Sequence, residues 1–440
     1  MRLAVEVSHR ATRHLGTTYA TSPIRIGPHS EGWLTMPDAK IDFNPFAVET
    51  IENPYPGLAI LRKFAPVYEV ENLFFRIISR YDDVVAALRD TASFSSSIID
   101  ASFAGDYTPV PGSSGNNMMA KDPPEHSRFR GLVNRAFTPK AVANLRVAIE
   151  TFVADAIERI RDEPEWDFVH EIGQALPVNI FFKMLGVEPE MYGQARQWSH
   201  DIKTASRFTV GRQMPTADED SYLRQAMKDY GDYLEYLVNL RREHPGDDLV
   251  SGLVQAADEG EQLSHQEVLT MVFLLIGAGT ESTQKFISNT LLAFLNHPDQ
   301  YRMLREDRSL IPNAVQEVLR FDGPAIFMAR ITTRDVEMAG TVIPAQSPCL
   351  VSFASANHDD SKFPNPERFD ITRDTSGLVA FGHGLHRCLG APLATLEGTV
   401  VLEQLLDNFA GFDWDPSRVV RDDNFFIRGL NRLPISPTRV

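Results

Sequence analysis

Apolar residues recur every three or four positions through the middle of the chain, from about residue 138 to residue 296. Leu145, Ile149 and Phe152 illustrate this spacing, which is typical of helices that bury one face. Closer to the N-terminus, two short runs of apolar residues within positions 67–79 predict a hairpin of short strands. The hydrophobic pattern therefore predicts a mainly α fold with a minor β portion.

No internal repeat or long low-complexity linker interrupts this pattern, so we expect a single domain over residues 42–440. Residues 1–41 mix Gly, Pro, Ser and His with little periodicity, and we predict an N-terminal extension of uncertain order. The segment from Phe94 to Met118 is rich in Ser, Gly and Pro, which predicts a long loop.

One helix in the middle of the pattern is unusually long. Ser264 and Glu267 form a capping-box sequence, and the helical spacing then continues to about Asn296. At the rise of an α-helix, this segment is about 48 Å long. Its centre holds Gly277-Ala278-Gly279, although each glycine costs a helix about 1 kcal/mol relative to alanine.

Two interpretations of this helix centre remain open on its residues alone. The hydroxyl residues that follow, Thr280, Ser282 and Thr283, could bond back to carbonyls one turn earlier in a kinked core helix. Alternatively, the small residues could make room above a planar cofactor while an acid and an alcohol manage protons.

Composition and charge exclude several classes of protein. A formal net charge of −16 argues against a nucleic-acid partner, which calls for a basic surface. The longest apolar stretch is shorter than the roughly 20 residues that cross a bilayer, and the N-terminus lacks the apolar core of a signal peptide. The two cysteines, Cys349 and Cys388, are too few for a disulfide framework. We therefore expect a cytoplasmic protein with no membrane span.

The decapeptide from Phe381 to Gly390 is the strongest candidate for chemistry. It contains three glycines, and Ala391-Pro392 then opens a helix, which predicts that Cys388 lies at a helix N-terminus. The exposed amides there would lower the pKa of the thiol and prepare it as a metal ligand. A structural turn, a zinc site with His383 and His386, and a thiolate ligand to haem iron are the three interpretations.

The complete spacing of this decapeptide resembles the Phe-x-x-Gly-x-His-x-Cys-x-Gly signature of the cytochrome P-450 family. Further segments resemble that family's motifs in the same order along the chain. These are His126-x-x-x-Arg130, Ala278-Gly279-Thr280-Glu281-Ser282-Thr283, Glu317-x-x-Arg320 and Pro366-Glu367-Arg368-Phe369.

The resemblance implies a triangular helical domain whose long central helix lies over haem b, with an axial thiolate from Cys388. It makes Glu281 and Ser282 the catalytic residues that manage protons, with Ser282 in place of the family's usual Thr. It makes Glu317, Arg320 and the Pro366–Phe369 segment a buried charged network. The implied cofactor-binding residues are His126, Arg130, Ala278, Arg330, Phe381, His386, Cys388 and Gly390.

The resemblance also implies a monooxygenase that inserts one oxygen atom from O2 into a hydrophobic small molecule. Its electrons would come from a separate ferredoxin or flavodoxin-type donor, for which Arg128, Arg135 and Arg387 form a candidate docking patch. The expected substrate-lining residues are Leu274, Gly277, Ile326, Phe327, Phe425 and Phe426, and the 94–118 and 191–214 segments are expected to close over the substrate. A non-catalytic haem sensor and a peroxide-driven enzyme are the alternatives; the acid and alcohol pair favours the oxygenase.

Overall fold

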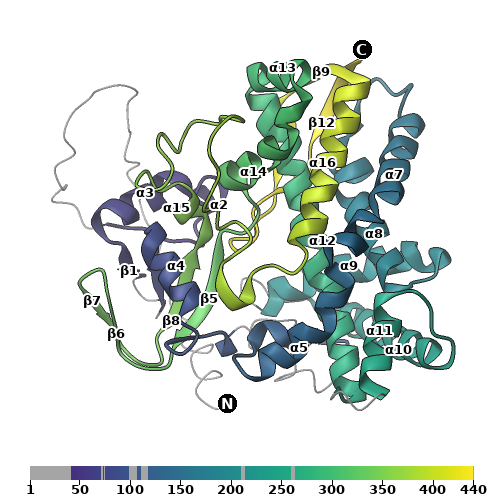
Figure 1. Ribbon diagram of the computed structural model, residues 1–440, viewed down its shortest axis with the longest axis horizontal. Helices are drawn as coiled ribbons and strands as arrows, with labels where there is room; N and C mark the ends of the chain where they lie inside the picture. The colour runs from purple at the N-terminus through teal and green to yellow at the C-terminus, as the bar shows by residue number, and fades with distance from the viewer. Residues whose placement is uncertain are drawn as a thin grey trace.

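The computed structural model describes residues 41–70, 73, 75–98, 107–110, 117–209, 214–258 and 263–439. Helices dominate these residues, and most of them gather on one side of the molecule (Figure 1). The α-helices are α2 Val48–Glu52, α3 Tyr55–Phe64, α4 Tyr81–Arg89, α5 Glu125–Val133, α6 Pro139–Ala143, α7 Arg146–Arg159, α8 Ala175–Leu185, α9 Tyr192–Thr209, α10 Ala217–Glu243, α11 Leu249–Asp258, α12 His265–Asn296, α13 Pro298–Glu306, α14 Ile311–Asp322, α15 Phe353–Asn357 and α16 Ala391–Asn408.

The main sheet lies on the other side of the molecule, next to α3 and α4 (Figure 1). Its order is β1-β2-β8-β5-β3, and all neighbours are antiparallel except β2 and β8. Its strands are β1 Val67–Glu69, β2 Arg76–Ile78, β3 Phe94–Ser95, β5 Phe327–Thr332 and β8 Pro348–Ser352. The smaller sheets comprise β4 Trp166–Asp167, β12 Pro434–Arg439 and β9 Phe409–Trp414, then β6 Val336–Met338 with β7 Thr341–Ile343, and β10 Val420–Arg421 with β11 Leu430–Arg432.

Helix α12 is the centre of the helical layer. The capping box forms as predicted, since the Ser264 hydroxyl accepts the amide of Glu267 at 3.2 Å while the Glu267 carboxylate accepts the amide of Ser264 at 2.7 Å. The helix packs against α8, α10, α14 and α16, and its apolar side chains are buried on most faces. A helix enclosed in this way is a rigid axis on which a site can be built.

The β elements confirm the predicted hairpin and correct the predicted loop. Strands β1 and β2 pair antiparallel within positions 67–79. Phe94 and Ser95, expected in a loop, form β3 because their backbone pairs with Ile331 and Thr332 of β5. Residues 99–106 and 111–116 of that segment lie outside the described residues. No helix among the described residues is both long and apolar enough to span a membrane.

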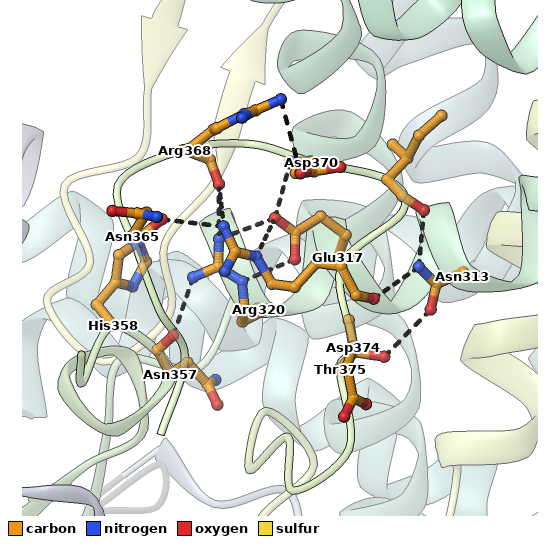
Figure 2. A network of polar contacts seen from close by, with 12 residues as sticks. Asn313, Glu317, Arg320, Asn357, His358, Asn365, Arg368, Asp370, Asp374 and Thr375 are labelled. Carbon is orange, nitrogen blue, oxygen red and sulfur yellow. Dashed lines mark hydrogen bonds and ion pairs between the residues drawn. The ribbon is translucent and has the colours of Figure 1, made fainter. Parts of the chain in front are cut away.

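A buried ion-pair network joins α14 to the segment that leads to the Cys388 loop (Figure 2). The guanidinium of Arg320 donates to both carboxylate oxygens of Glu317, at 2.7 and 2.9 Å, and both side chains have no exposed surface. Arg320 also donates to the carbonyls of Asn357 and Arg368, at 3.0 and 3.2 Å. The network therefore connects α14 to α15 and to the turn around Arg368.

The second arginine of this network is not the one that the sequence motif indicates. The Arg368 side chain is 70% exposed and lies 3.7 Å from Asp370, whereas only its backbone carbonyl meets Arg320 (Figure 2). Arg373 instead donates to Glu317 at 3.3 Å and is 9% exposed. The correction has a physical reason: Arg373 also donates to three carbonyls of the 364–368 turn, so its guanidinium is satisfied in the interior.

We predict that Glu317→Gln and Arg320→Leu each lower the free energy of unfolding by about 3–5 kcal/mol, because the first leaves Arg320 without its carboxylate and the second removes the closer of the two arginines that pair with Glu317. Arg373→Leu should also destabilise, by about 1–3 kcal/mol. Arg368→Leu is the matched control and should change stability by no more than about 0.5 kcal/mol. Urea unfolding of the four variants measures these values, and an equal loss in Arg368→Leu and Arg373→Leu would contradict the assignment.

Candidate active site

Glycine backbone geometry shapes the Cys388 loop. Gly382 and Gly384 have φ values of +69° and +70°, in the left-handed region that favours glycine. A β-carbon on Gly384 would lie 2.8 Å from the carbonyl oxygen of Leu88, so α4 also packs directly against this backbone. The amide of Cys388 donates to the carbonyl of Phe381 at 2.8 Å, which closes the loop.

Helix α16 begins directly after this loop, at Ala391, with Gly390 as its N-cap and Pro392 in the first turn. This confirms that Cys388 lies at a helix N-terminus. Phe381 is half-buried and packs against the main hydrophobic core, which anchors the start of the loop.

The thiol of Cys388 does not have the lowered pKa that its position predicts. Burial raises the pKa, and this effect outweighs the amides of Gly390 and Ala391 and the guanidinium groups of Arg130 and Arg387, all of which lower it. The residue is nevertheless exposed in the structure. A ligand can therefore approach Cys388, and the amides and guanidinium groups around its sulfur favour the anionic form.

The two histidines of the loop point to different partners. The His383 ring lies 3.1 Å from the guanidinium of Arg89. The His386 ring lies 3.1 Å from the hydroxyl of Ser96 and packs against the His126 ring at a centroid distance of 4.2 Å. In the part of the chain that the structure describes, no group of three or more His, Cys, Asp or Glu residues could hold a metal ion. This argues against the zinc interpretation.

Four cation-forming side chains, from three parts of the chain, gather beside the Cys388 loop. His126 and Arg130 come from α5, Arg330 from β5 and His386 from the loop itself. Burial and then Arg330 lower the pKa of His386 to about 3, with His126 and Arg130 adding to the effect. Burial likewise lowers the pKa of Arg330 to about 10 and that of His126. The charges of Arg130 and Arg330 thus act on both imidazole rings and disfavour their protonation.

Among the described residues, one carboxylate, that of Asp122, acts on this cationic cluster of His126, Arg130, Arg330 and His386. The nearby carboxylate of Asp122 accepts hydrogen bonds from the Ser95 hydroxyl at 2.5 Å and the Ser96 amide at 3.0 Å. The buried Nδ1 of His126 and Nε of Arg330 have no hydrogen-bond partner among the described residues. Because buried donors are normally satisfied, the cluster fits an anionic ligand such as the two carboxylates of haem.

The centre of α12 presents one exposed face. Ala278 is exposed although most of the helix around it is buried, and Gly277, Glu281 and Ser282 are partly exposed. The Ser282 hydroxyl donates to the carbonyl of Ala278 at 3.2 Å, so both residues lie on this face. A planar group could approach the helix here.

Gly279 does not belong to that face. A β-carbon on Gly279 would lie 2.5 Å from the ring of Phe181, so this glycine allows α8 to pack closely against α12. Thr280 and Thr283 are buried, and their hydroxyls donate to the carbonyls of Ile276 and Gly279 at 2.9 and 3.3 Å. The expectation that all the small residues make room for a cofactor is therefore wrong for Gly279.

The expected substrate-lining residues fall into two groups. Leu274 is buried in the main core, on α12. Ile326, Phe327, Phe425 and Phe426 instead pack in one cluster beside the main sheet. The ring of Phe425 lies 4.1 Å from that of Phe426. It also lies 4.3 Å from the ring of Phe46 on its other side.

One titratable residue near the site was missed in the sequence. Glu397 lies on α16, nine positions after Cys388, and is 1% exposed. Its Oε2 has no hydrogen-bond partner among the described residues, and burial raises its pKa to about 8. Glu397 is the one charged residue in the Leu393–Leu402 stretch, and this is the signal that could have identified it. This carboxyl holds a proton at neutral pH.

Comparison with known proteins agrees with this geometry. The family model described as "Cytochrome P450" matches residues 69–430. The chain is 37% identical to "Cytochrome P450 107B1" of Saccharopolyspora erythraea over 82% of this chain and 89% of that protein. It is 32% identical to "Polyketide biosynthesis cytochrome P450 PksS" of Bacillus subtilis, over 90% of this chain and 99% of that protein. The solved structure of cytochrome P450 CYP109Q5 from Chondromyces apiculatus superposes with a TM-score of 0.83 at 35% identity. The match covers 91% of this chain and 99% of that chain.

We predict that Glu397 makes stability depend on pH. Its pKa is about 8 in the folded protein and 4.5 for an ordinary glutamate, so between these values the folded chain keeps a proton that the unfolded chain has lost. The stabilisation that this carboxyl contributes is fully present below a pH of 4.5. It is lost as the pH rises towards about 8, at up to about 1.4 kcal/mol per pH unit.

Glu397→Gln removes this dependence. Urea unfolding at about pH 5 and about pH 8 should show that the free energy of unfolding of the variant rises relative to that of wild type as the pH rises. Glu403→Gln, on the outer face of the same helix, is the matched control and should keep a constant difference from wild type. A constant difference in Glu397→Gln as well would show that the carboxyl is already ionised in the native protein.

Proposed function

Since this chain belongs to the cytochrome P450 family and is therefore a haem-dependent monooxygenase, we propose that Cys388 is its iron ligand and that it oxidises a hydrophobic product of secondary metabolism. The observation that supports the assignment is the combination of an exposed cysteine at a helix N-terminus with an adjacent cationic cluster in which His126 Nδ1 and Arg330 Nε are buried without a hydrogen-bond partner among the described residues. Family membership also favours an enzyme over a haem sensor.

Haem b, when bound, supplies O2 activation and the transfer of one oxygen atom to the substrate. The sulfur of Cys388 would hold the iron, and the amides of Gly390 and Ala391 would stabilise its negative charge. His126, Arg130, Arg330 and His386 would bind the two haem carboxylates. The unpartnered donors of His126 and Arg330 support this arrangement.

Glu281 and Ser282 are the residues that we assign to proton handling. Both lie on the partly exposed face of α12, where Ala278 leaves room for the cofactor. The Ser282 hydroxyl bonds to the Ala278 carbonyl at 3.2 Å, and its Oγ keeps a further lone pair to accept a proton from water. Ser282 lacks the methyl group that restricts threonine rotamers, so its hydroxyl is less firmly oriented.

The substrate class follows from the apolar lining and from the relatives. We assign Leu274, Gly277, Ile326, Phe327, Phe425 and Phe426 to the substrate side. Their side chains offer dispersion contacts and no charge, which selects a hydrophobic molecule. The name of the PksS relative refers to polyketide biosynthesis, and a polyketide is the substrate class that we propose for this chain.

The electron donor that we propose is an acidic ferredoxin or flavodoxin. Arg387 and Arg89 are exposed beside the Cys388 loop and offer positive charge to such a partner. Arg128, expected in the same patch, instead pairs with Glu267 at 2.6 Å and is only 28% exposed, so it is no longer part of the proposal. The side chain of Arg135 lies outside the described residues. Cys349 and Cys388 are both free, which fits a cytoplasmic location.

Replacing Cys388 tests the assignment directly. Haem-loaded wild-type protein, reduced and exposed to carbon monoxide, should give the long-wavelength absorption of a sulfur-ligated haem, and Cys388→Ala should not. Cys349→Ala removes the other cysteine, which is buried in the main sheet, and should keep the absorption. Persistence of the absorption in Cys388→Ala would overturn the proposed function.

Changes at Ser282 test proton handling. Ser282→Ala should increase the peroxide released per electron consumed, because the hydroxyl that orients a proton donor is lost. Ser282→Thr should decrease it, because the added methyl restricts the hydroxyl rotamer. Thr280→Val is the control, since that hydroxyl is buried against the Ile276 carbonyl and faces away from the site. Equal peroxide release in Ser282→Ala and wild type would exclude the role.

A further inference from the structure

A fully buried lysine lies one turn beyond Ser282 on α12. Lys285 has no exposed surface, and its Nζ donates to Asp422 at 2.5 Å, to the Leu430 carbonyl at 3.0 Å and to Asn431 Oδ1 at 2.9 Å. Gly429 permits this approach, because a β-carbon there would lie 2.4 Å from the lysine side chain. A buried ammonium requires such pairing, and the pairing fixes its geometry.

The hydrogen bonds continue from this lysine into the 424–428 turn, which joins β10 to β11. Asp422 accepts Lys285 through Oδ2 and the amide of Asn424 through Oδ1, the latter at 3.1 Å. Asn424 Oδ1 in turn accepts the amides of Phe426 and Ile427, at 2.9 and 3.2 Å. An unbroken chain of bonds therefore runs from α12 to the backbone that carries Phe426.

The same turn also holds the segment before β5. The amide of Ile326 donates to the carbonyl of Phe426 at 2.9 Å, and the amide of Arg428 donates to the carbonyl of Pro324 at 2.7 Å. Asn289, one turn after Lys285, donates to the Arg428 carbonyl at 3.3 Å. The 424–428 turn and the segment before β5 are thus both connected by hydrogen bonds to α12, close to Ser282. The proposed function places these two segments against the substrate.

We propose that Lys285 is a positioning residue that sets the distance between the 424–428 turn and the exposed face of α12, and thereby selects ligands by shape. The inference rests on the proposed function, which gives that face to the haem and Phe426 to the substrate. Lys285 acts through Asp422 and Asn424 and does not touch the ligand itself.

The test compares two nitrogen ligands of ferric haem, imidazole and 4-phenylimidazole, by optical titration of the holoenzyme. Both bind iron through the same atom, but only the phenyl group of the larger ligand extends to the pocket wall. The variants are Asn424→Ala, which removes the last link without leaving a buried charge, and the double variant Lys285→Met/Asp422→Leu, which removes both buried charges together.

In both variants we expect the Kd of 4-phenylimidazole to rise about fivefold or more relative to that of imidazole, because the wall that meets the phenyl group is no longer held. Asp307→Ala is the matched control: Asp307 Oδ1 accepts the Ser309 amide at 2.9 Å in a similar turn at the end of α13. This control should keep the wild-type ratio even if its thermal unfolding midpoint falls.

A wild-type ratio in Asn424→Ala, or an equal rise in both Kd values, would overturn the positioning role. If the double variant fails to fold, Asn424→Ala alone decides. Failure of the proposed function is a separate result, because it appears in the wild-type protein as the absence of a sulfur-ligated carbon monoxide complex.

Discussion

The constraint on which the site depends is a cluster of buried donors whose positive charge is met by one carboxylate. Two imidazoles and two guanidiniums lie beside the Cys388 loop, while the Asp122 carboxylate accepts hydrogen bonds from the Ser95 hydroxyl and the Ser96 amide. Burial is the largest cause of the lowered pKa values of His386 and Arg330, and a pKa of about 3 leaves the His386 ring neutral near pH 7. A dianionic ligand would add negative charge beside the two guanidiniums and satisfy the open donors, so cofactor binding should contribute to the stability of the native state as well as to its chemistry.

One buried ion pair holds the scaffold around α14, and another connects α12 to the proposed site. Glu317 and Arg320 tie α14 to α15 and to the turn around Arg368 (Figure 2), and Arg373 donates to the same turn. Lys285 and Asp422 tie α12 to a turn that carries aromatic side chains. Both pairs are fully buried, and the second connects to the turn that we assign to the substrate side. The charges in this chain are therefore used to fix distances between elements that the hydrophobic core alone would leave free to slide.

The sequence predicted the elements whose signals are local. The capping box at Ser264, the helix after Cys388 and the β1–β2 hairpin all depend on neighbouring residues, and all form as expected. Features that depend on distant partners were not predictable. The place of Arg373 beside Glu317 is set by a turn fifty residues away in sequence, the raised pKa of the Cys388 thiol depends on burial, and the packing of Gly279 depends on Phe181 of another helix. Glu397 was missed for the same reason, since its neutral state comes from the surrounding fold.

The contact between Gly279 and Phe181 restricts how this protein could acquire new specificities. The ring of Phe181 occupies the space that a side chain at position 279 would need, so a larger residue there would have to displace α8. Changing the spacing of these two helices therefore requires coordinated substitutions on both of them. Single substitutions can alter specificity only at side chains outside this contact.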